Sequence, residues 1–579
     1  MSKFVVSPRD YTHLVEKRQT VALNKELSIK IPFESFDVLL FAKKNSSFQF
    51  FEQFQDGFIG CIGTPIFFSD LSLADIYRGF QETELGHVCD VIGGHFVLLI
   101  HKENYLYVIS DGIGSIDVFY GSDQKPIVSN DLSCVALSSS LEYDSEMCEI
   151  ESVCLSPGKR TVFNHVQKLI GGVEYLKIKA SGEVQVYRHG NSIRKRLERF
   201  SSWKDSDYFD RVKTVFDAFS KSNQTVGLNF TGGLDGRTIL ASLLDTETQV
   251  EFYYGQGNSQ ITNTQDKDLQ IAREVANDLR IPIHIMDWKT ESSDAEETDV
   301  AKDYLLLGSF AKVHGGSEAF VQSLTLRNQQ RRDIVFMGGF SPGFSNKDFH
   351  ERQYHSFQEI VSDCLKGPLQ SVAFKYYNKV SKKFYHECQL YCLAHELIDE
   401  QDQLLVDGHI IRALLYLRPE SEHLQLFNLF DKYVAPYNTN ELLIPMLSLN
   451  TSFRRGRKLQ LNLIHQLRPD LLNYHLFSGI ADRTITKNLE IDTKKVEKKS
   501  FKIPNKYLAY RYYILKRPIP KKHHGQDLEM YTRVMEQLSN QFKNRWFGFV
   551  IFNLRYCLRL RFSYRIIHYQ RVLMDELGE

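Results

Sequence analysis

The chain has 579 residues, of which 42% are hydrophobic and 25% are charged, the composition of an ordinary globular protein. Its 71 basic and 71 acidic residues cancel, which argues against a chain that binds polyanions along its whole length and against an acidic disordered one. No apolar run reaches the ~18 residues of a membrane span, and no secretory signal is visible. The nine cysteines do not have the spacing of a disulfide framework of exported proteins. We therefore expect a soluble, cytoplasmic, multidomain protein.

The sequence of about the first 190 residues predicts mainly β structure. Short apolar runs alternate with turn signals, and we expect strands at 36–42, 57–63, 94–101, 105–110, 161–163 and 173–178. Many short antiparallel strands within 200 residues predict a sandwich or layered β domain.

The pattern changes near Arg194. Apolar residues at helical spacing between Tyr208 and Phe219 predict a helix. Strands then alternate with helices: strands are expected at 225–230, 250–254 and 281–286, and helices at 238–244 and 268–279. This alternation predicts a parallel α/β sheet. From about residue 350 the sequence reads as mostly helical.

The neutral total conceals an uneven distribution of charge. Residues 483–579 carry a net charge of +12, and residues 1–482 carry −12. Basic residues interleaved with aromatic ones can follow a nucleic-acid backbone or lie on an anionic membrane surface. We favour a third interpretation, in which this basic region packs on the acidic remainder, and an anionic partner stays the alternative.

Residues 225–244, TVGLNFTGGLDGRTILASLL, carry the clearest chemistry. An apolar strand runs into a glycine-rich turn and then a helix, so exposed backbone N–H groups and the positive end of the helix dipole would form a phosphate site. Asp235 suits Mg²⁺ beside phosphate oxygens, and Arg237 could add a charged contact. The residues expected to contact the nucleotide are Asn229, Phe230, Thr231, Gly232, Gly233, Leu234, Asp235, Gly236 and Arg237, with Tyr254, Met337 and Gly338 from neighbouring strands. A tight turn without a ligand is the alternative.

The segment Thr231–Gly236, TGGLDG, resembles the SGGLDS pyrophosphate loop of the asparagine synthetase family, the PP-loop ATP-pyrophosphatase ligases. Four other segments resemble this family in the same order along the chain. Residues 94–120 resemble part of the family's glutaminase-like domain, and residues 161–172 resemble the hairpin that closes that domain. Residues 268–276 and 434–442 resemble parts of its synthetase domain. The resemblance covers roughly residues 60–480.

The resemblance implies an α+β then α/β chain. An Ntn-hydrolase-like αββα sandwich would occupy residues 1–190, a PP-loop parallel α/β synthetase domain 195–480, and a basic helical C-terminal extension 481–579. It also implies ATP and Mg²⁺ as cofactors. Small-molecule or peptide carboxylates and amines would be the substrates, joined through an acyl-adenylate, and a homodimer is the assembly we allow for.

Two departures from the family pattern shape the functional hypothesis. Glutamine-using members begin, after Met removal, with a nucleophilic cysteine, but position 2 is Ser2 and the first cysteine, Cys61, lies in an apolar strand. We therefore expect no glutaminase activity. The family's second acidic motif, S-G-E-G-x-D-E, is also absent, because its acidic positions fall at Gly339 and Pro342.

The family keeps a lysine near the end of the synthetase domain. Arg454, Arg455, Arg457 and Lys458 lie in a suitable place, and we take Arg457 and Lys458 as catalytic candidates, against the alternative of a solvated basic helix face. The leading hypothesis is an AMP-forming carbon–nitrogen ligase. A non-catalytic binding or assembly protein, motivated by the missing acidic pair, and a PP-loop enzyme acting on RNA, motivated by the basic region, are the alternatives.

One further cluster has the spacing of metal ligands. Cys388, Cys392 and His395 would share one helical face at i, i+4 and i+7. Leucine and tyrosine residues accompany them there, so we expect buried core residues and no metal site.

Overall fold

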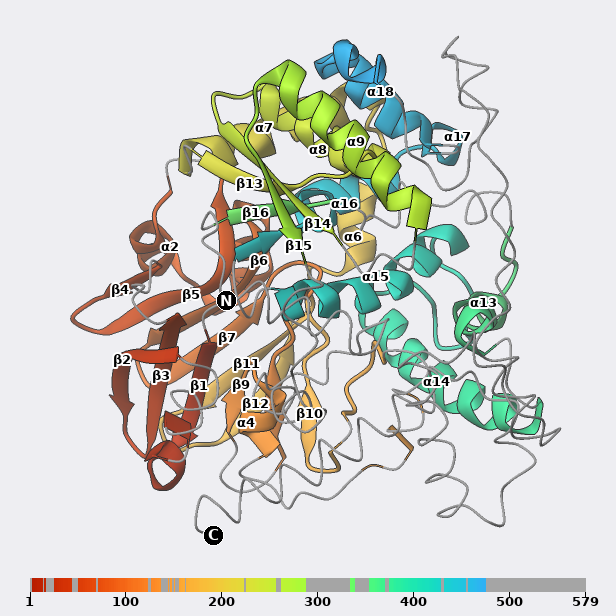
Figure 1. Cartoon of the computed structure of the whole chain (residues 1–579). Coiled ribbons are helices and arrows are strands. Elements are labelled where there is room, and N and C mark those ends of the chain that lie inside the picture. Colours follow the sequence, from red (N-terminus) through yellow and green to blue (C-terminus); the bar gives the residue numbers. More distant parts are fainter. Residues whose placement is uncertain are drawn as a thin grey trace, which may run out of the picture.

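The computed structural model describes residues 3–474, apart from 14, 17–24, 44–49, 69–70, 123–126, 137–143, 145, 148–149, 151–155, 162, 223–224, 257–261, 288–333, 339–352, 370–373, 428–431 and 455–456. This part of the chain is mixed α/β, with two antiparallel sheets followed by one parallel sheet (Figure 1). The predicted extension 481–579 lies outside the described residues. Among the described helices, none combines the length and the apolar character needed to cross a membrane.

Two antiparallel sheets form the N-terminal part, with strand orders β10-β8-β9-β1-β3-β2 and β12-β11-β7-β6-β5-β4. The strands of the first are β1 (Lys3–Pro8), β2 (Lys25–Phe33), β3 (Phe36–Lys43), β8 (Phe119–Gly121), β9 (Val128–Ser129) and β10 (Val166–Lys168). Those of the second are β4 (Phe51–Gln53), β5 (Gly57–Phe67), β6 (Ile92–Lys102), β7 (Tyr105–Ser110), β11 (Glu174–Lys179) and β12 (Val184–Arg188). The sheets pack face to face because alternate side chains, such as Val6 and Leu40 on one sheet and Ile62 and Leu99 on the other, share one core.

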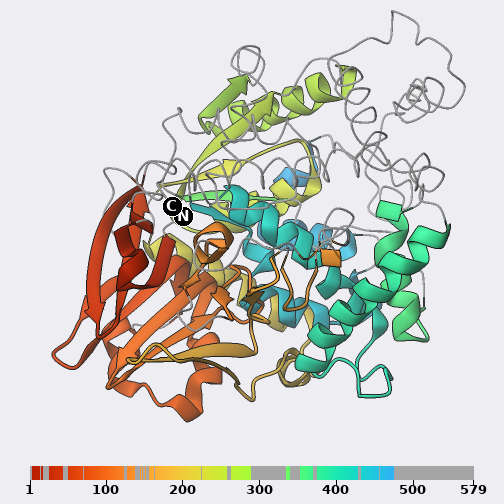
Figure 2. The same ribbon diagram turned by 90° about the horizontal axis from the view of Figure 1, so that it is seen from below.

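Short helices cover the outer faces of both sheets. Helices α2 (Leu73–Gly79) and α3 (Leu85–Val91), joined by the 3₁₀ turn η1 (Glu82–Glu84), pack on the second sheet, where Ile76 contributes to a core with Leu98. Helix α4 (Leu132–Ala136) packs on the first sheet, where Val135 lies in a core with Leu39. The order of layers in this part is therefore helix, sheet, sheet, helix. From below, the sheets (red to orange) and the green-to-teal helices lie on opposite sides of the molecule (Figure 2).

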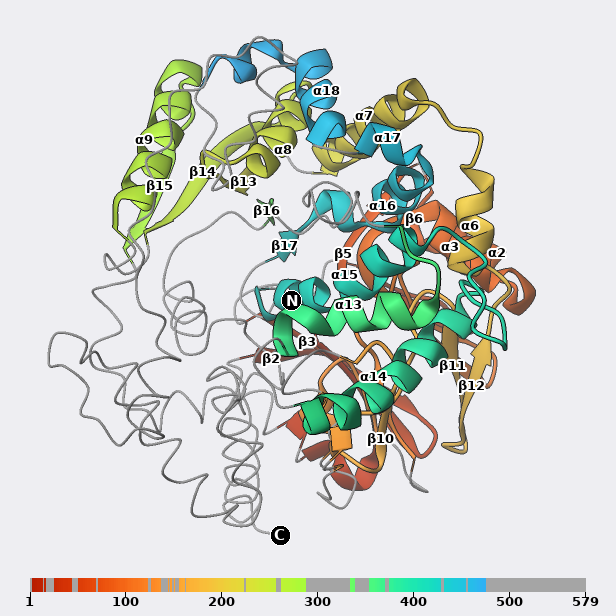
Figure 3. The same ribbon diagram turned by 90° about the vertical axis from the view of Figure 1, so that its right-hand side faces the viewer.

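The parallel sheet has the order β15-β14-β13-β16-β17 (Figure 3). Its strands are β13 (Thr225–Asn229), β14 (Gln249–Gln256), β15 (Ile283–Asp287), β16 (Ile334–Met337) and β17 (Lys432–Val434), with helices α6 (Ile193–Arg199), α7 (Asp205–Ser222), α8 (Leu234–Leu244) and α9 (Thr262–Leu279) before and between them. The chain builds outward from β13 to β15 and then returns to the other side of β13 as β16. The carboxyl ends of β13 and β16 thus meet at a topological switch point, where open α/β sheets bind ligands.

The described residues from 353 to 474 are mostly helical, as expected. Its helices are α13 (Phe357–Leu369), α14 (Phe374–Ala394), α15 (Gly408–Phe427), α16 (Asn440–Ser448), α17 (Thr451–Arg454) and α18 (Lys458–Leu467), with 3₁₀ turns η3 (Pro436–Asn438) and η5 (Pro469–Leu472). Helix α18 packs on α8, and α16 packs on α7 and on β6 of the N-terminal part.

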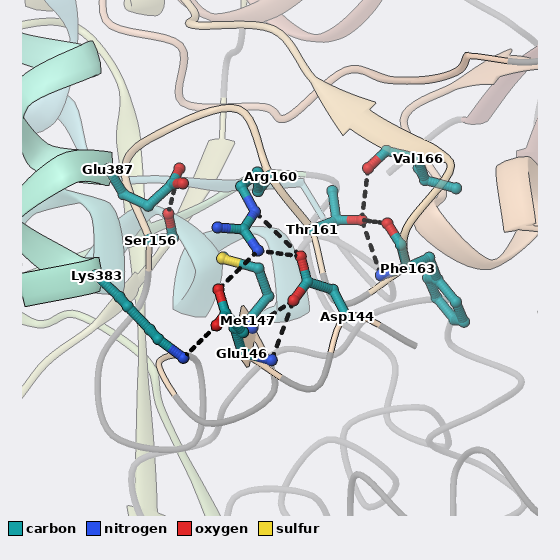
Figure 4. Close-up of polar contacts among 10 residues, drawn as sticks. All are labelled: Asp144, Glu146, Met147, Ser156, Arg160, Thr161, Phe163, Val166, Lys383 and Glu387. Atoms are coloured by element: carbon teal, nitrogen blue, oxygen red, sulfur yellow. Dashed lines mark hydrogen bonds and ion pairs between the residues drawn. The ribbon is translucent and has the colours of Figure 1, made fainter. Parts of the chain in front are cut away.

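A polar network joins Asp144, Glu146, Ser156 and Arg160 of the N-terminal part to helix α14 (Figure 4). Glu146 bridges the two, because its carboxylate lies 2.7 Å from Lys383 Nζ and 3.5 Å from Arg160 Nη2. Glu387 is fully buried and accepts a hydrogen bond from Ser156 Oγ at 3.3 Å. Half-exposed ion pairs of this kind contribute about 0–1 kcal/mol each. The network therefore fixes the position of α14 more than it stabilises the fold.

A second, fully buried seam joins β6 to the residues that follow β17. The N–H of Gly94 donates to Oε2 of Glu441 at 3.1 Å, and His95 Nε2 lies 3.3 Å from the carbonyl oxygen of Ala435. A Cβ on Gly93 would meet Glu441 Cδ at 2.8 Å, so only glycine lets this carboxyl group approach the strand. Burial raises the pKa of Glu441 to about 7, although its bond from Gly94 opposes the shift.

The coarse architecture confirms the expectation of antiparallel strands followed by a parallel sheet, while the Ntn-type assignment and the domain boundaries stay predictions. One local expectation was wrong. Helix α8 begins at Leu234 and not at Thr238, since aspartate and glycine are well tolerated in a first turn. The strand expected at 161–163 includes residue 162, which lies outside the described residues; the bridge next to it joins Arg160 to Gln167. Strands β1 and β2 were not predicted at all.

Candidate functional site

The glycine-rich turn lies at the switch point of the parallel sheet. Strand β13 ends at Asn229, which is in register with Met337 at the end of β16. Gly338 follows, and a Cβ on it would meet the backbone nitrogen of Gly236 at 2.9 Å and Asp235 Cβ at 3.1 Å. A side chain at position 338 would therefore push the turn away from the sheet. The structure thus brings together the predicted residues that follow β13 and β16.

The turn ends in the N-terminus of α8. Gly233 is the N-cap residue and provides no side-chain hydrogen bond to the helix, whose first turn contains Leu234, Asp235 and Gly236. The first N–H groups of an α-helix have no partner within the helix, and the helix dipole places partial positive charge there. Thr231 is exposed beside them, and its Oγ1 accepts the N–H of Gly233 at 3.3 Å. This end of the helix can accept an anionic group.

Asp268 of α9 holds the turn from the other side. Its Oδ1 accepts the N–H of Gly232 at 2.6 Å, and its Oδ2 accepts the hydroxyl of Tyr254 at 3.4 Å. Burial raises the pKa of Asp268, and both hydrogen bonds and the charge of Arg237 oppose that shift. The sequence placed Asp268 at the start of a segment that resembles the family's synthetase domain, and in the structure its carboxylate anchors the backbone of the turn. Tyr254, a predicted nucleotide contact, positions that anchor.

Asp235, the predicted metal ligand, is half-buried and has one partner that the sequence did not suggest. Oδ1 of Asp235 accepts a hydrogen bond from Nε2 of Gln460 at 2.5 Å, and Gln460, on α18, is fully buried. A carboxylate and an amide oxygen are the hard ligands that Mg²⁺ prefers. Nothing in the sequence points to this contact, because Gln460 stands among leucines along α18.

Arg237 bonds to backbone carbonyl groups of the turn and of residues 471–474. Its guanidinium is fully buried and donates to three carbonyl oxygens: Leu471 at 3.2 Å, Tyr474 at 2.9 Å and Gly232 at 3.3 Å. Burial lowers the pKa of Arg237 to about 10, although nearby acidic groups, Asp268 among them, oppose the shift. The side chain braces the first turn of α8 against residues 471–474, and a phosphate contact from it stays a prediction.

The remaining predicted site residues differ in their placement. Phe230 is fully buried and stacks on Phe252 with ring centroids 4.2 Å apart, so it belongs to the core beneath the turn. Arg457 has a left-handed backbone with φ of 64° and precedes α18, and Lys458 begins this helix exposed. Both lie two or three residues before Gln460, at the start of the helix that contacts Asp235. Gly339 and Pro342, where the family has acidic residues, lie outside the described residues.

The cysteines behave as core residues. Cys388, Cys392 and His395 are fully buried, and burial raises the pKa of Cys392 well above its usual value. Within the described ranges, no three His, Cys, Asp or Glu side chains gather as a metal site. Cys61 is buried in β5, and burial raises its pKa too, which disfavours the nucleophilic thiolate.

Comparison with known proteins gives weak structural likenesses only. No protein-family model and no curated protein matches the chain. Among solved structures, it is similar to a B. subtilis glutamine phosphoribosylpyrophosphate amidotransferase complexed with ADP and GMP (10% identity, TM-score 0.22), covering 49% of this chain and 66% of that one, just under two thirds.

Two further solved structures are similar at the same low level. One is an allosteric regulatory enzyme of purine biosynthesis (9% identity, TM-score 0.25, 64% of this chain and 78% of that one). The other is a U34-tRNA thiolase from Methanococcus maripaludis with its 4Fe-4S cluster (10% identity, TM-score 0.18, 40% and 79%). The functional argument therefore rests on the geometry of the switch-point turn.

Proposed function

We propose that the chain is an ATP-dependent ligase that joins a carboxylate to an amine through an acyl-adenylate, without glutaminase activity. One observation carries the proposal: a glycine turn and an uncapped helix N-terminus stand at the switch point of a parallel sheet, with Gly338 leaving room beside Asp235. The N-terminal sandwich would be an Ntn-type domain without its nucleophile.

In this reaction a carboxylate oxygen attacks the α-phosphorus of ATP, and pyrophosphate leaves. The amine then attacks the acyl carbon, and AMP leaves. The first-turn N–H groups of α8 would bind the departing pyrophosphate oxygens, where negative charge develops. Asp235 would hold Mg²⁺, which supplies further charge stabilisation. Arg457 and Lys458 would add positive charge from α18. Asp268 keeps the turn in place by holding the N–H of Gly232.

The residues at the turn fit a magnesium ion. Asp235 offers a carboxylate, and the side-chain oxygens of Asn229 and Gln460 are buried acceptors without a hydrogen-bond donor. Mg²⁺ usually keeps several water ligands, and these donate hydrogen bonds to such acceptors.

Nucleotide binding tests the proposal before the substrates are known. We expect calorimetry to show ATP binding in the presence of Mg²⁺, and Asp235→Ala to weaken it about tenfold or more. Asp210→Ala, which removes an exposed carboxylate of α7, is the matched control and should bind as the parent does. Candidate carboxylates can then be screened for AMP and pyrophosphate formation. Absence of ATP binding in the parent would leave the non-catalytic alternative.

The missing glutaminase step has its own test. Ser2→Ala should leave every activity of the protein unchanged, because a serine hydroxyl without an activating base is a poor nucleophile. Glutamate release from glutamine is the quantity to measure. Glutamine hydrolysis by the parent that disappears in the Ser2→Ala variant would overturn this part of the proposal.

A further inference from the structure

The contact between α18 and the turn involves a buried polar group whose bonding is incomplete. Gln460 is fully buried on α18, which packs against α8. Its Nε2 donates to Asp235, but its Oε1 is buried without a hydrogen-bond donor. Buried amide groups in folded proteins are normally satisfied at both ends. The unsatisfied oxygen therefore indicates a donor that arrives from outside the protein chain.

The orientation of this amide is fixed by its neighbour. An amide rotated by 180° would bring Oε1 against the carboxylate oxygen of Asp235 at 2.5 Å, where two acceptors would repel. Nε2 therefore faces Asp235, and Oε1, on the same amide carbon, lies one atom further from the carboxylate. The amide thus constrains one oxygen of the carboxylate and places a second, neutral acceptor next to it.

We propose that Gln460 is the positioning residue of a magnesium site at Asp235, and that its Oε1 accepts a hydrogen bond from a water bound to this ion. The inference rests on the proposed function, and it names a residue for a site that lacks the second acidic motif. A neutral amide suits this place, because a second carboxylate 2.5 Å from Asp235 would be repelled whenever the cation is absent.

Three variants separate this role from simple packing. Gln460→Leu keeps the approximate volume and removes the amide, Gln460→Glu replaces it with a carboxylate, and Gln466→Leu makes the first change at an exposed position of the same helix. Mn²⁺ binding to the protein with ADP, followed by electron paramagnetic resonance, reports the metal directly. Calorimetry of ADP binding with Mg²⁺ and with EDTA reports the nucleotide.

For Gln460→Leu we expect metal affinity to fall about 10- to 100-fold, the usual loss when a group that orients a metal ligand is removed. ADP affinity in EDTA should stay within about twofold of the parent by the same reasoning, and Gln466→Leu should match the parent in both. Gln460→Glu should melt at a lower temperature than the parent in EDTA and gain more thermal stability from Mg²⁺ than the parent does.

Other results would contradict the inference. If Gln460→Leu and Gln460→Glu lower ADP affinity equally with and without metal, Gln460 serves packing alone and the inference is wrong. The same holds if both variants keep the metal affinity of the parent. If Gln460→Leu does not fold, the response of Gln460→Glu to Mg²⁺ decides. A parent that binds no nucleotide overturns the proposed function together with this inference, whereas a Mg²⁺-dependent parent with unaffected variants overturns the inference only.

Discussion

At the scale of single residues, the buried carboxyl group of Glu441 links stability to pH. Its pKa is raised by burial to about 7, whereas an unfolded glutamate titrates near 4.5. The folded state therefore binds the proton more tightly between these values, and the free energy of unfolding falls as pH rises through about 4.5 to 7. In Glu441→Gln that decline, on the order of 1–3 kcal/mol, should disappear. Urea unfolding at pH 5, 6, 7 and 8 measures it.

The control for this prediction is Glu198→Gln, at an exposed position of α6. It should show the same dependence on pH as the parent. Parallel curves for Glu441→Gln and the parent would contradict the assigned origin of the pH dependence.

Gly338 gives a second prediction at this scale. A methyl group at this position would lie 2.9 Å from the backbone nitrogen of Gly236, closer than real contacts allow. Overpacking of this kind costs about 1–3 kcal/mol. If the turn moves to relieve it, nucleotide affinity in Gly338→Ala should fall about tenfold. Gly79→Ala, at the end of α2, adds its methyl group to open space and should bind as the parent does.

At the scale of elements, Arg237 couples the start of α8 to residues 471–474. Arg237→Met would leave three carbonyl oxygens without their donor, so we expect the free energy of unfolding to fall by on the order of 3 kcal/mol. Denaturant unfolding measures this loss. A variant with parental stability and weaker nucleotide binding would instead show that Arg237 contacts phosphate.

Prediction from sequence succeeded where the signal was local to an element. The apolar run before Thr231 and the glycines after it specify a strand, turn and helix within a dozen residues, and the structure has all three in order. The resemblance of residues 268–276, which include Asp268, to a segment of the asparagine synthetase family was also visible in the sequence. Gln460 gave no signal, because its role arises only when α18 packs against a turn 225 residues earlier. Cys388 and Cys392 were correctly expected in the core, since leucine and tyrosine accompany them.

At the scale of the whole molecule, the buried seam at Glu441 and Gly94 should make the N-terminal sandwich and the parallel-sheet part unfold together. We expect one calorimetric transition for the parent. Glu441→Lys places a charge that cannot accept the Gly94 N–H in a buried site, and it should split the transition in two. Glu198→Lys, an equal change of charge at an exposed position, should retain a single transition. Two transitions in the parent would show that the seam does not couple the parts.

The wide separation of the residues around the turn has a consequence for biosynthesis. Asp235 meets Gln460 across 225 residues, and Gly94 meets Glu441 across 347. Contacts between such distant residues form slowly, because closing long stretches of chain costs entropy before any contact forms. During translation the turn leaves the ribosome long before α18 does. The growing chain therefore holds the turn without its contact to Gln460 until α18 has been synthesised.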